Sequence, residues 1–354
     1  KIGVIFGGMS TENEVSVASG NSILRNLDET KYEIYPIYIG KDGIWYEAEK
    51  PKEDQKFGSQ AKSKEKIENP INYLKNLDIL FPVLHGLYGE DGTIQGLFEL
   101  LKKPYVGCKV LASSVGMDKV YTKIIFEKAG LKQAKYQYIR KNKENYIYVD
   151  NQFNEQTVSL EEVANKITEN IKFPMFIKPS NSGSSVGINK ANDKEELKDY
   201  IKYATQFDYK ILIEEGIQGR EVECAVLGNE EVIASTVGEV KAATEFYSYE
   251  AKYKNEQSKT QIPADIEKEL ENEIRSQAIK AFKAIDGKGL ARVDFFIEKD
   301  SNQIYINEIN TLPGFTHISM YPKLFESSGI DYQELLNKLI ELSKLSWKKK
   351  EKGI

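Results

Sequence analysis

Four polar residues with chemistry suited to phosphates and metal ions lie close together near the end of the chain. Arg292 and Asp294 belong to one run of strand-like residues, and Glu308 and Asn310 belong to the next. Side chains alternate between the two faces of a strand, so each pair shares one face. If the two runs form a hairpin that turns at Ser301, Asp294 lies opposite Glu308 and Arg292 lies opposite Asn310.

Opposed carboxylates in such a hairpin repel one another unless a cation lies between them. Directly paired residues have Cβ atoms about 4.5–5.5 Å apart, and like charges at that distance destabilise a sheet. Two carboxylates and an amide oxygen are hard ligands that suit Mg²⁺, with water and phosphate oxygens completing its shell. The alternative is an edge hairpin with an exposed acidic face, and the spacing alone leaves both interpretations open.

A second segment has the composition of a phosphate-binding loop. Lys178 ends an apolar run, and the residues that follow it as far as Gly187 are mostly small, including Gly183, Ser184 and Ser185. Small residues let backbone N–H groups and hydroxyls close around phosphate oxygens, while a lysine supplies a positive charge. The lysine precedes the loop, so this is not a Walker motif, and a flexible polar turn is the alternative.

Two further predicted strand ends carry polar residues. Glu214 and Glu215 end an apolar run and Glu221 follows, so these groups could hold an adenine edge and ribose hydroxyls. The alternative is that they are solvated surface glutamates. His85 begins a glycine-rich segment between an apolar run and a predicted helix, which is where open α/β sheets bind ligands. A buried structural histidine is the alternative for His85.

The elements around these segments alternate between strands and helices, which indicates α/β layers with a parallel sheet in the first 110 residues. The pattern predicts helices at 15–24, 93–102, 119–128, 194–204 and 265–285. It predicts strands at 2–6, 32–39, 77–84, 173–178, 210–215, 222–227, 232–237, 291–297 and 303–309. Two polar segments remain: a surface excursion at 48–70 and a loop at 239–262 that is long enough to act as a lid.

Composition excludes several classes of protein. The 354 residues predict two or three domains, at a prior of about 150 residues per domain. The net charge of −5 argues against a general nucleic-acid binder. No run approaches the roughly 18 apolar residues of a membrane span, and two cysteines cannot form a disulfide framework. We therefore expect a cytoplasmic protein without a membrane partner.

Seven motifs, in order along the chain to about residue 343, resemble those of the D-alanine–D-alanine ligases, a family of the ATP-grasp superfamily. They span residues 6–16, 85–93, 117–119, 178–187, 249–253, 292–294 and 307–316. The resemblance implies an α/β protein (α+β overall) with ATP held between its central and C-terminal parts. The implied divisions are a Rossmann-like N-terminal substrate domain at 1–110, a central ATP-grasp subdomain at 111–217, a C-terminal ATP-grasp catalytic domain at 218–345, and a solvated, frayed tail at 346–354.

Members of this family join two D-alanine molecules and convert ATP to ADP and phosphate, in peptidoglycan precursor synthesis. A carboxylate is a poor electrophile, so ATP first phosphorylates one D-alanine, and the amine of the second attacks the acyl phosphate. The resemblance implies ATP, two Mg²⁺ ions with Mn²⁺ as an alternative, two D-alanine substrates and a homodimer. A ligase that adds D-lactate or D-serine is the alternative within the enzyme class. A non-catalytic ATP-binding module is the alternative outside it.

The resemblance also implies a role for each candidate residue. The Mg²⁺ ligands would be Asp294, Glu308 and Asn310. The ATP-binding residues would be Lys119, Lys178, Ser185, Glu214, Glu215, Ile217, Glu221 and Lys252. The residues around the reacting amino acids would be Glu14, His85, Ser184, Tyr253, Arg292, Gly314 and Ser319.

Within that last group, Glu14 would bind the ammonium of the first D-alanine and Ser319 the carboxylate of the second. Arg292 and the N–H of Gly314 would face the tetrahedral oxyanion. Glu14, Ser184 and Tyr253 would form a latch that closes the 239–262 loop and excludes water from the acyl phosphate. Two residues stand apart: Asn13 replaces the histidine of many family members, and His317 is expected to be structural or merely adjacent to the site.

Overall fold

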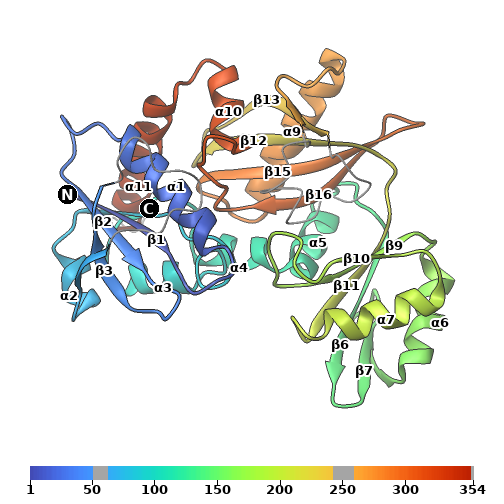
Figure 1. Cartoon of the computed structure of the whole chain (residues 1–354). Helices are drawn as coiled ribbons and strands as arrows, with labels where there is room; N and C mark the ends of the chain where they lie inside the picture. Colours follow the sequence, from blue (N-terminus) through green and yellow to red (C-terminus); the bar gives the residue numbers. More distant parts are fainter. Residues whose placement is uncertain (51–62, 242–258, 352–354) are drawn as a thin grey trace.

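Three β-sheets follow one another along the chain (Figure 1). The structure is a computed structural model that describes residues 1–50, 63–241 and 259–351. None of the helices in these ranges combines the length and the apolar character needed to cross a membrane.

The first sheet has the strand order β4-β3-β2-β1-β5. Its strands are β1 (Ile2–Gly7), β2 (Ile34–Ile39), β3 (Trp45–Ala48), β4 (Ser63–Lys66) and β5 (Ile79–Pro82). The strand β1 pairs in parallel with β2 and with β5, which confirms the predicted parallel sheet. All six residues of β1 are buried, as expected for a central strand covered on both faces. The helices of this part are α1 (Asn13–Asn26), α2 (Pro70–Lys75), α3 (Thr93–Leu100) and α4 (Val110–Met117).

The second sheet is antiparallel and has the order β10-β9-β11-β6-β7-β8. Its strands are β6 (Tyr136–Asn142), β7 (Asn145–Val149), β8 (Glu155–Val158), β9 (Met175–Pro179), β10 (Asn189–Ala191) and β11 (Lys210–Glu215). The helices α6 (Leu160–Asn170) and α7 (Lys194–Ala204) pack side by side against it (Figure 1). The helix α5 (Lys119–Lys128) precedes this sheet, and the Asp118 carboxylate caps it by accepting from the N–H groups of Val120 and Tyr121.

The third sheet is also antiparallel, with the order β14-β13-β12-β15-β16. Its strands are β12 (Gly219–Gly228), β13 (Val232–Lys241), β14 (Lys259–Gln261), β15 (Gly289–Glu298) and β16 (Ile304–Asn310), and its helices are α9 (Lys268–Ala284), α10 (Met320–Ser327) and α11 (Tyr332–Glu351). Part of the predicted 239–262 loop is therefore strand, because β13 and β14 pair at its two ends.

The register of β15 and β16 confirms the central prediction of the sequence. Asp294 pairs with Glu308, and Arg292 pairs with Asn310. The predicted symmetric turn is wrong beyond that point, because the register shifts after Asp294 and Phe295 pairs with Ile306. The shift is a bulge, which lets the strand bend next to the two carboxylates.

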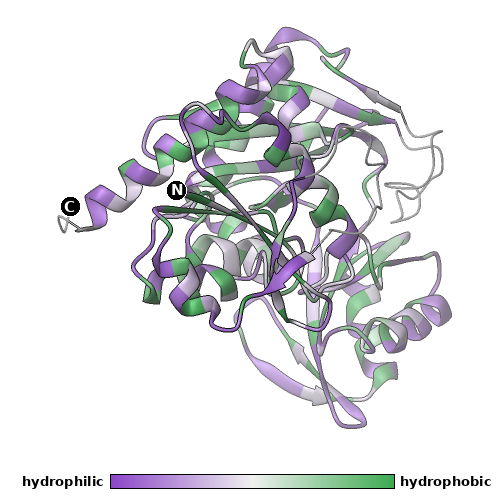
Figure 2. Ribbon diagram, turned by 60° about the vertical axis from the view of Figure 1, so that its left-hand side comes forward, coloured by the Kyte–Doolittle hydropathy of each residue, from purple (hydrophilic) through white to green (hydrophobic). Residues whose placement is uncertain are grey.

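The C-terminal end is more regular than expected. Helix α11 continues to Glu351, so the prediction of a frayed tail is wrong, although the side chains of Lys348, Lys349 and Lys350 are exposed. The helix persists because its apolar face is anchored in the core and because Lys350 forms an ion pair with Glu99. Figure 2 shows hydrophobic and hydrophilic segments alternating along this helix.

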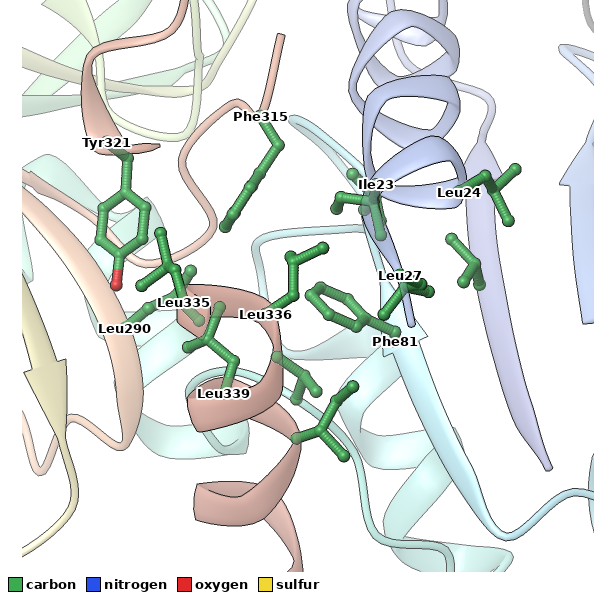
Figure 3. Close-up of a cluster of buried hydrophobic side chains, with 14 of the residues drawn as sticks. Ile23, Leu24, Leu27, Phe81, Leu290, Phe315, Tyr321, Leu335, Leu336 and Leu339 are labelled. Atoms are coloured by element: carbon green, nitrogen blue, oxygen red, sulfur yellow. The ribbon is translucent and has the colours of Figure 1, made fainter. Parts of the chain in front are cut away.

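One hydrophobic cluster joins the first and third sheets (Figure 3). It contains Phe81 of β5, Ile23 of α1, Leu27 at the C-cap of α1, and Phe315 and Leu336 from the C-terminal part. These side chains are almost fully buried, so the C-terminal helix packs against the N-terminal sheet across sequence separations of more than two hundred residues. This packing sets the position of α1 relative to the β15–β16 hairpin.

Truncating this cluster should weaken the fold. Leu336→Ala removes a fully buried side chain from α11, and we expect it to lower the free energy of unfolding by about 2–5 kcal/mol. Urea unfolding followed by circular dichroism measures the change. The matched control is Leu345→Ala on the same helix, where the side chain is 55% exposed and the expected change is within about 0.5 kcal/mol. Equal losses in the two variants would contradict this account of the cluster.

Candidate active site

Two adjoining cavities lie where the three sheets approach one another. One has a volume of about 170 Å³ and the other about 420 Å³. Ser185, Ile188 and Glu308 line both cavities and so form their common wall. The larger volume is within the range of about 300–1,000 Å³ that is typical of small-molecule sites.

The smaller cavity collects residues from all three parts of the chain. Its walls include the start of α1, the segment after β5, the start of α5, the loop after β9, and the β15–β16 hairpin with the loop that follows it. The structure thereby brings together most of the residues predicted around the amino acids and the metal ions. Those that line this cavity are His85, Lys119, Ser184, Ser185, Arg292, Glu308, Asn310, Gly314 and Ser319.

Glu14 does not face this cavity. Its side chain is 61% exposed and lies 3.5 Å from the Nζ of Lys41. Glu12, two residues earlier, is buried and lines the cavity, where its carboxylate accepts a hydrogen bond from the hydroxyl of Ser184. The sequence interpretation therefore chose the wrong glutamate of the motif for the Ser184 contact. The helical spacing could have indicated this. Ala18 and Arg25 lie four and eleven positions after Glu14, so the three residues share the outer face of α1.

Two glycines make room for the carboxylate of Glu12. A Cβ on Gly86 would lie 2.5 Å from Oε2 of Glu12, and a Cβ on Gly183 would lie 2.7 Å from the same atom. Neither position can therefore carry a larger residue without displacing Glu12. Asn13 is turned away from this carboxylate and donates a 2.7 Å hydrogen bond to the carbonyl oxygen of Gly8.

Arg292 is surrounded by carboxylates. Its Nε and Nη2 each donate a 2.7 Å hydrogen bond to Asp294, and Nε lies 3.1 Å from Oε2 of Glu223 on β12. Burial alone would lower the pKa of the guanidinium, but the attraction of Asp294 and Glu223 outweighs it and raises that pKa well above its ordinary value. The sequence interpretation missed Glu223, whose pairing with Asp294 depends on the neighbouring strand.

The predicted metal ligands are neighbours in the register of the hairpin. Asp294 and Glu308 are register partners, and Asn310 lies one pair further along. The Oδ1 of Asn310 accepts a 2.9 Å hydrogen bond from the backbone N–H of Leu312. Glu308 lies in the common wall and Asn310 lines the smaller cavity, whereas Asp294 is buried beside them and is not among the residues that line either cavity. Two carboxylates and one amide oxygen are nevertheless a type of donor set that suits Mg²⁺.

The larger cavity holds a buried carboxylate between two lysines. Glu214, at the end of β11, forms ion pairs with Lys178 of β9 and, at 2.9 Å, with Lys123 of α5. Burial alone would raise the pKa of Glu214, but the attraction of the two lysines outweighs it and lowers the pKa to about 2. The sequence interpretation missed Lys123, because its approach to Glu214 depends on how α5 packs against the sheet.

The rest of the larger cavity combines polar and aromatic residues. Glu215, Ile217 and Glu221 line it, as do the rings of Phe176, Phe296 and Tyr305. Arg220 closes one side by donating two 2.8 Å hydrogen bonds to Glu239. A flat apolar group with polar edges fits such a lining.

The loop after β9 has an unusual backbone beside both cavities. Ser184 and Ser185 have φ angles of 49° and 60°, in the left-handed region that L-residues seldom adopt. Lys119 lies beside this loop, because its N–H donates to the carbonyl oxygen of Ser180 at 3.0 Å and its Nζ donates to that of Ser182. The loop and the start of α5 are thus held together as one wall.

The remaining predicted residues differ in their surroundings. His85 lines the smaller cavity, but both of its ring nitrogens lie within hydrogen-bond distance of protein atoms, which favours the structural alternative. Ser319 lies next to Gly314, with its Oγ accepting a 2.9 Å hydrogen bond from the N–H of Thr316. His317 is exposed. Lys252 and Tyr253 lie outside the described residues, so their predicted roles stay predictions.

Comparison with known sequences identifies the class of protein. The family model described as "D-ala D-ala ligase N-terminus" matches residues 1–108, and the model described as "D-ala D-ala ligase C-terminus" matches residues 125–341. The D-alanine–D-alanine ligase of Acetivibrio thermocellus is 51% identical over 96% of this chain and 94% of its own length. That of Clostridium acetobutylicum is 47% identical over 97% of each chain. The chain belongs to the D-alanine–D-alanine ligase family.

Solved structures agree with this assignment. The D-alanine–D-alanine ligase from Coxiella burnetii has a TM-score of 0.80 at 32% identity and covers 99% of this chain and 95% of its own. The VanG D-Ala:D-Ser ligase from Enterococcus faecalis has a TM-score of 0.82 at 37% identity and covers 97% of this chain and 98% of its own. The fold is that of the ATP-grasp ligases, as the resemblance implied.

The ion pairs of Glu214 make a prediction about acid stability. A carboxyl group whose pKa is lowered on folding stabilises the protein above its ordinary pKa, here 4.5, and loses that contribution as the pH falls towards about 2. Glu214→Gln should therefore be less stable than the native protein at neutral pH, by about 3–5 kcal/mol, because two buried lysines lose their partner. The difference should shrink as the pH falls from 4.5 towards 2.

Urea unfolding at a series of pH values measures this difference. Glu215→Gln, at the next position of β11, is the matched control, because its side chain is less buried and takes no part in these lysine pairs. A difference between Glu214→Gln and the native protein that stays constant over this pH range would show that the lysines do not stabilise the ionised carboxylate.

Proposed function

We propose that this protein is an ATP-dependent ligase that joins two D-alanine molecules into D-alanyl-D-alanine for peptidoglycan precursors. The observation that carries the proposal is the common wall of the two cavities. Glu308 stands in that wall, with a cavity of nucleotide size, the buried Lys123 and the partly buried Lys178 on one side. On the other side are a buried carboxylate, Glu12, and a buried guanidinium, Arg292. The carboxylate of an amino acid in the smaller cavity can therefore lie next to the terminal phosphate of a nucleotide in the larger one.

The nucleotide would occupy the larger cavity. Its base would lie among Phe176, Phe296 and Tyr305, with Glu215, the backbone to Ile217 and Glu221 at its polar edges and its ribose. Lys178 and Lys119 would face the phosphates together with the hydroxyl of Ser185, and Lys252 would join them from outside the described residues. Glu214 would hold Lys178 and Lys123 in place for the phosphates through its ion pairs with both.

Divalent ions belong at the common wall. Asp294, Glu308 and Asn310 would hold two Mg²⁺ ions, with Mn²⁺ as an alternative, and the ions neutralise charge on the β- and γ-phosphates. The carboxylate of Asp294, which now binds Arg292 through both oxygens, would then contact the metal ion as well. Glu223 provides a second partner that keeps the guanidinium in the cavity during this change.

The two amino acids would occupy the smaller cavity. Glu12, in place of Glu14, would bind the ammonium of the first D-alanine, since it is the buried carboxylate of the motif. Arg292 and the N–H of Gly314 would face the oxyanion of the tetrahedral intermediate. Ser319 would bind the carboxylate of the second D-alanine. The contact between Ser184 and Glu12 supports a latch at the mouth of this cavity, which Tyr253 would complete.

D-Alanine is the proposed second substrate. The curated relatives at 51% and 47% identity are named D-alanine–D-alanine ligases, whereas the structure named as a D-Ala:D-Ser ligase is 37% identical. The Tyr253 that follows Lys252 resembles the dipeptide-forming type. We also propose a cytoplasmic homodimer with functional divisions near residues 110 and 217, which separate the three sheets.

The reaction itself provides the first test. ADP release should depend on D-alanine and should not occur with L-alanine, and D-alanyl-D-alanine should accumulate in equal amount. Glu308→Gln should lower kcat on the order of 100-fold or more, because it removes a charge from the metal site. A coupled ADP assay with product analysis measures both.

Asp300→Asn, in the exposed turn of the same hairpin, is the matched control and should keep native kcat. A larger kcat/KM with D-serine or D-lactate than with D-alanine as acceptor would overturn the proposed specificity. Nucleotide binding without turnover on any of these acids would indicate a non-catalytic module.

The two glutamates of the first motif make a second, paired test. Glu12→Gln should raise the KM for the first D-alanine on the order of 10- to 100-fold, because it removes one charged partner of the ammonium. Glu14→Gln should leave that KM near the native value, because the Glu14 side chain points to solvent beside Lys41. Steady-state kinetics at saturating ATP measure both. The opposite ranking would restore the original assignment to Glu14.

A further inference from the structure

A chain of hydrogen bonds runs from His85 through Ser19 to the loop that carries Gly314. The Oγ of Ser19, on α1, lies 3.2 Å from Nε2 of His85 and accepts a 3.1 Å hydrogen bond from the N–H of Phe315. The other ring nitrogen of His85, Nδ1, lies 3.1 Å from the carbonyl oxygen of Leu312. Ser19 is fully buried and His85 almost fully, so water does not compete for these bonds.

These contacts determine where the imidazole hydrogen lies. The carbonyl oxygen of Leu312 can only accept a hydrogen bond, so Nδ1 of His85 carries the hydrogen. Oε1 of Glu90, at 3.5 Å from the same nitrogen, is also an acceptor and favours the same arrangement. The neutral ring then presents Nε2 as an acceptor, and the hydroxyl of Ser19 donates its one hydrogen to it.

We propose that Ser19 is a positioning residue, whose hydroxyl binds both Nε2 of His85 and the N–H of Phe315 and so fixes the backbone from Leu312 to Phe315. The two ends of this segment are bound separately, since His85 holds the carbonyl oxygen of Leu312 and Ser19 holds the N–H of Phe315. Gly314 lies between them. This inference rests on the proposed function, in which the N–H of Gly314 stabilises the oxyanion, and such a donor acts only when its placement is accurate.

Gly314 and Phe315 are held by two hydroxyl groups and by the hydrophobic cluster. A Cβ on Gly314 would lie 2.7 Å from the Oγ of Ser319 and 3.8 Å from the Oγ of Ser19, so the segment lies between these two hydroxyls. The ring of Phe315 points into the hydrophobic cluster beside α1 and α11 (Figure 3). Packing therefore anchors the side chain of Phe315, while Ser19 anchors its backbone amide.

Ser19→Ala tests the role in catalysis, with Ser16→Ala as its matched control. Ser16 lies one turn earlier on α1 and is equally buried, but its hydroxyl accepts from the N–H of Gly7 at 2.7 Å and donates to the carbonyl oxygen of Val83. Ser19→Ala should lower kcat for D-alanyl-D-alanine formation about 10- to 100-fold and leave the KM for ATP unchanged. Ser16→Ala should keep native kcat, although it also removes a buried hydroxyl. Ser19→Cys, which retains a weaker donor, should recover part of the kcat.

The tautomer of His85 provides a readout that does not depend on activity. The chain has only two histidines, so the imidazole ¹⁵N signals of His85 can be assigned with a His317→Asn variant. In the native protein at neutral pH we expect a protonated Nδ1 and an unprotonated Nε2. Ser19→Ala removes the hydrogen-bond partner of Nε2, so the Nε2 signal should shift while Nδ1 stays protonated beside Leu312. Both signals should stay at their native positions in Ser16→Ala.

Each failure has a distinct signature. A protonated Nε2 in the native protein, or an unchanged His85 spectrum and native kcat in Ser19→Ala, would overturn the role of Ser19. Failure of the native protein to form D-alanyl-D-alanine would overturn the proposed function instead, and the nitrogen spectra would still report whether Ser19 binds Nε2 of His85.

Discussion

The buried guanidinium of Arg292 is the interaction on which the arrangement of the site depends. It compensates the negative charge of Asp294 and Glu223, which neighbouring strands hold side by side, while Glu308 faces Asp294 from the next strand. Three buried or half-buried carboxylates in one sheet are unfavourable without such a cation. In the larger cavity the charges are reversed, because the single carboxylate of Glu214 compensates the positive charges of two lysines. The charged groups Asp294, Glu223, Lys123 and Lys178 are thus each held by a protein partner of opposite charge.

The second constraint is the hydrophobic cluster that joins the first and third sheets. It places α1 against the loop after β16, and this brings Glu12 and His85 to the cavity that Arg292 also lines, with Ser19 in contact with His85. The central sheet contributes the loop with Ser184 and Ser185, which meets Glu12 across the cavity. No single part of the chain contains a complete site. Catalysis therefore depends on how accurately three separate sheets are held together.

Much of this arrangement could be predicted from local patterns. The alternation of side chains along two strands was sufficient to pair Asp294 with Glu308, and helical spacing located α3, α5 and α7 to within a few residues. The hairpin bulge was missed, although the extra residue shifts the alternation: buried Ile304 and Ile306 are two positions apart, whereas buried Ile306 and Ile309 are three apart. The strands β6, β7 and β8 were not predicted, since their polar and aromatic residues obscure a simple two-residue period. Lys123, Glu223 and Ser19 were missed because their partners lie on distant elements.

Glu12 and Glu14 show most clearly what each level of structure decides. The sequence by itself determined the residue types, their order in seven motifs and the alternating faces of the hairpin, because these depend only on spacing along one element. It could not decide which glutamate enters the cavity. Glu12 is the N-cap of α1 and Glu14 lies in its first turn, so the choice depends on which side of the start of α1 is buried. Only the tertiary structure decides that, because the hydrophobic face of α1 packs against the first sheet and the C-terminal cluster, which turns Glu14 to solvent and leaves Glu12 at the cavity.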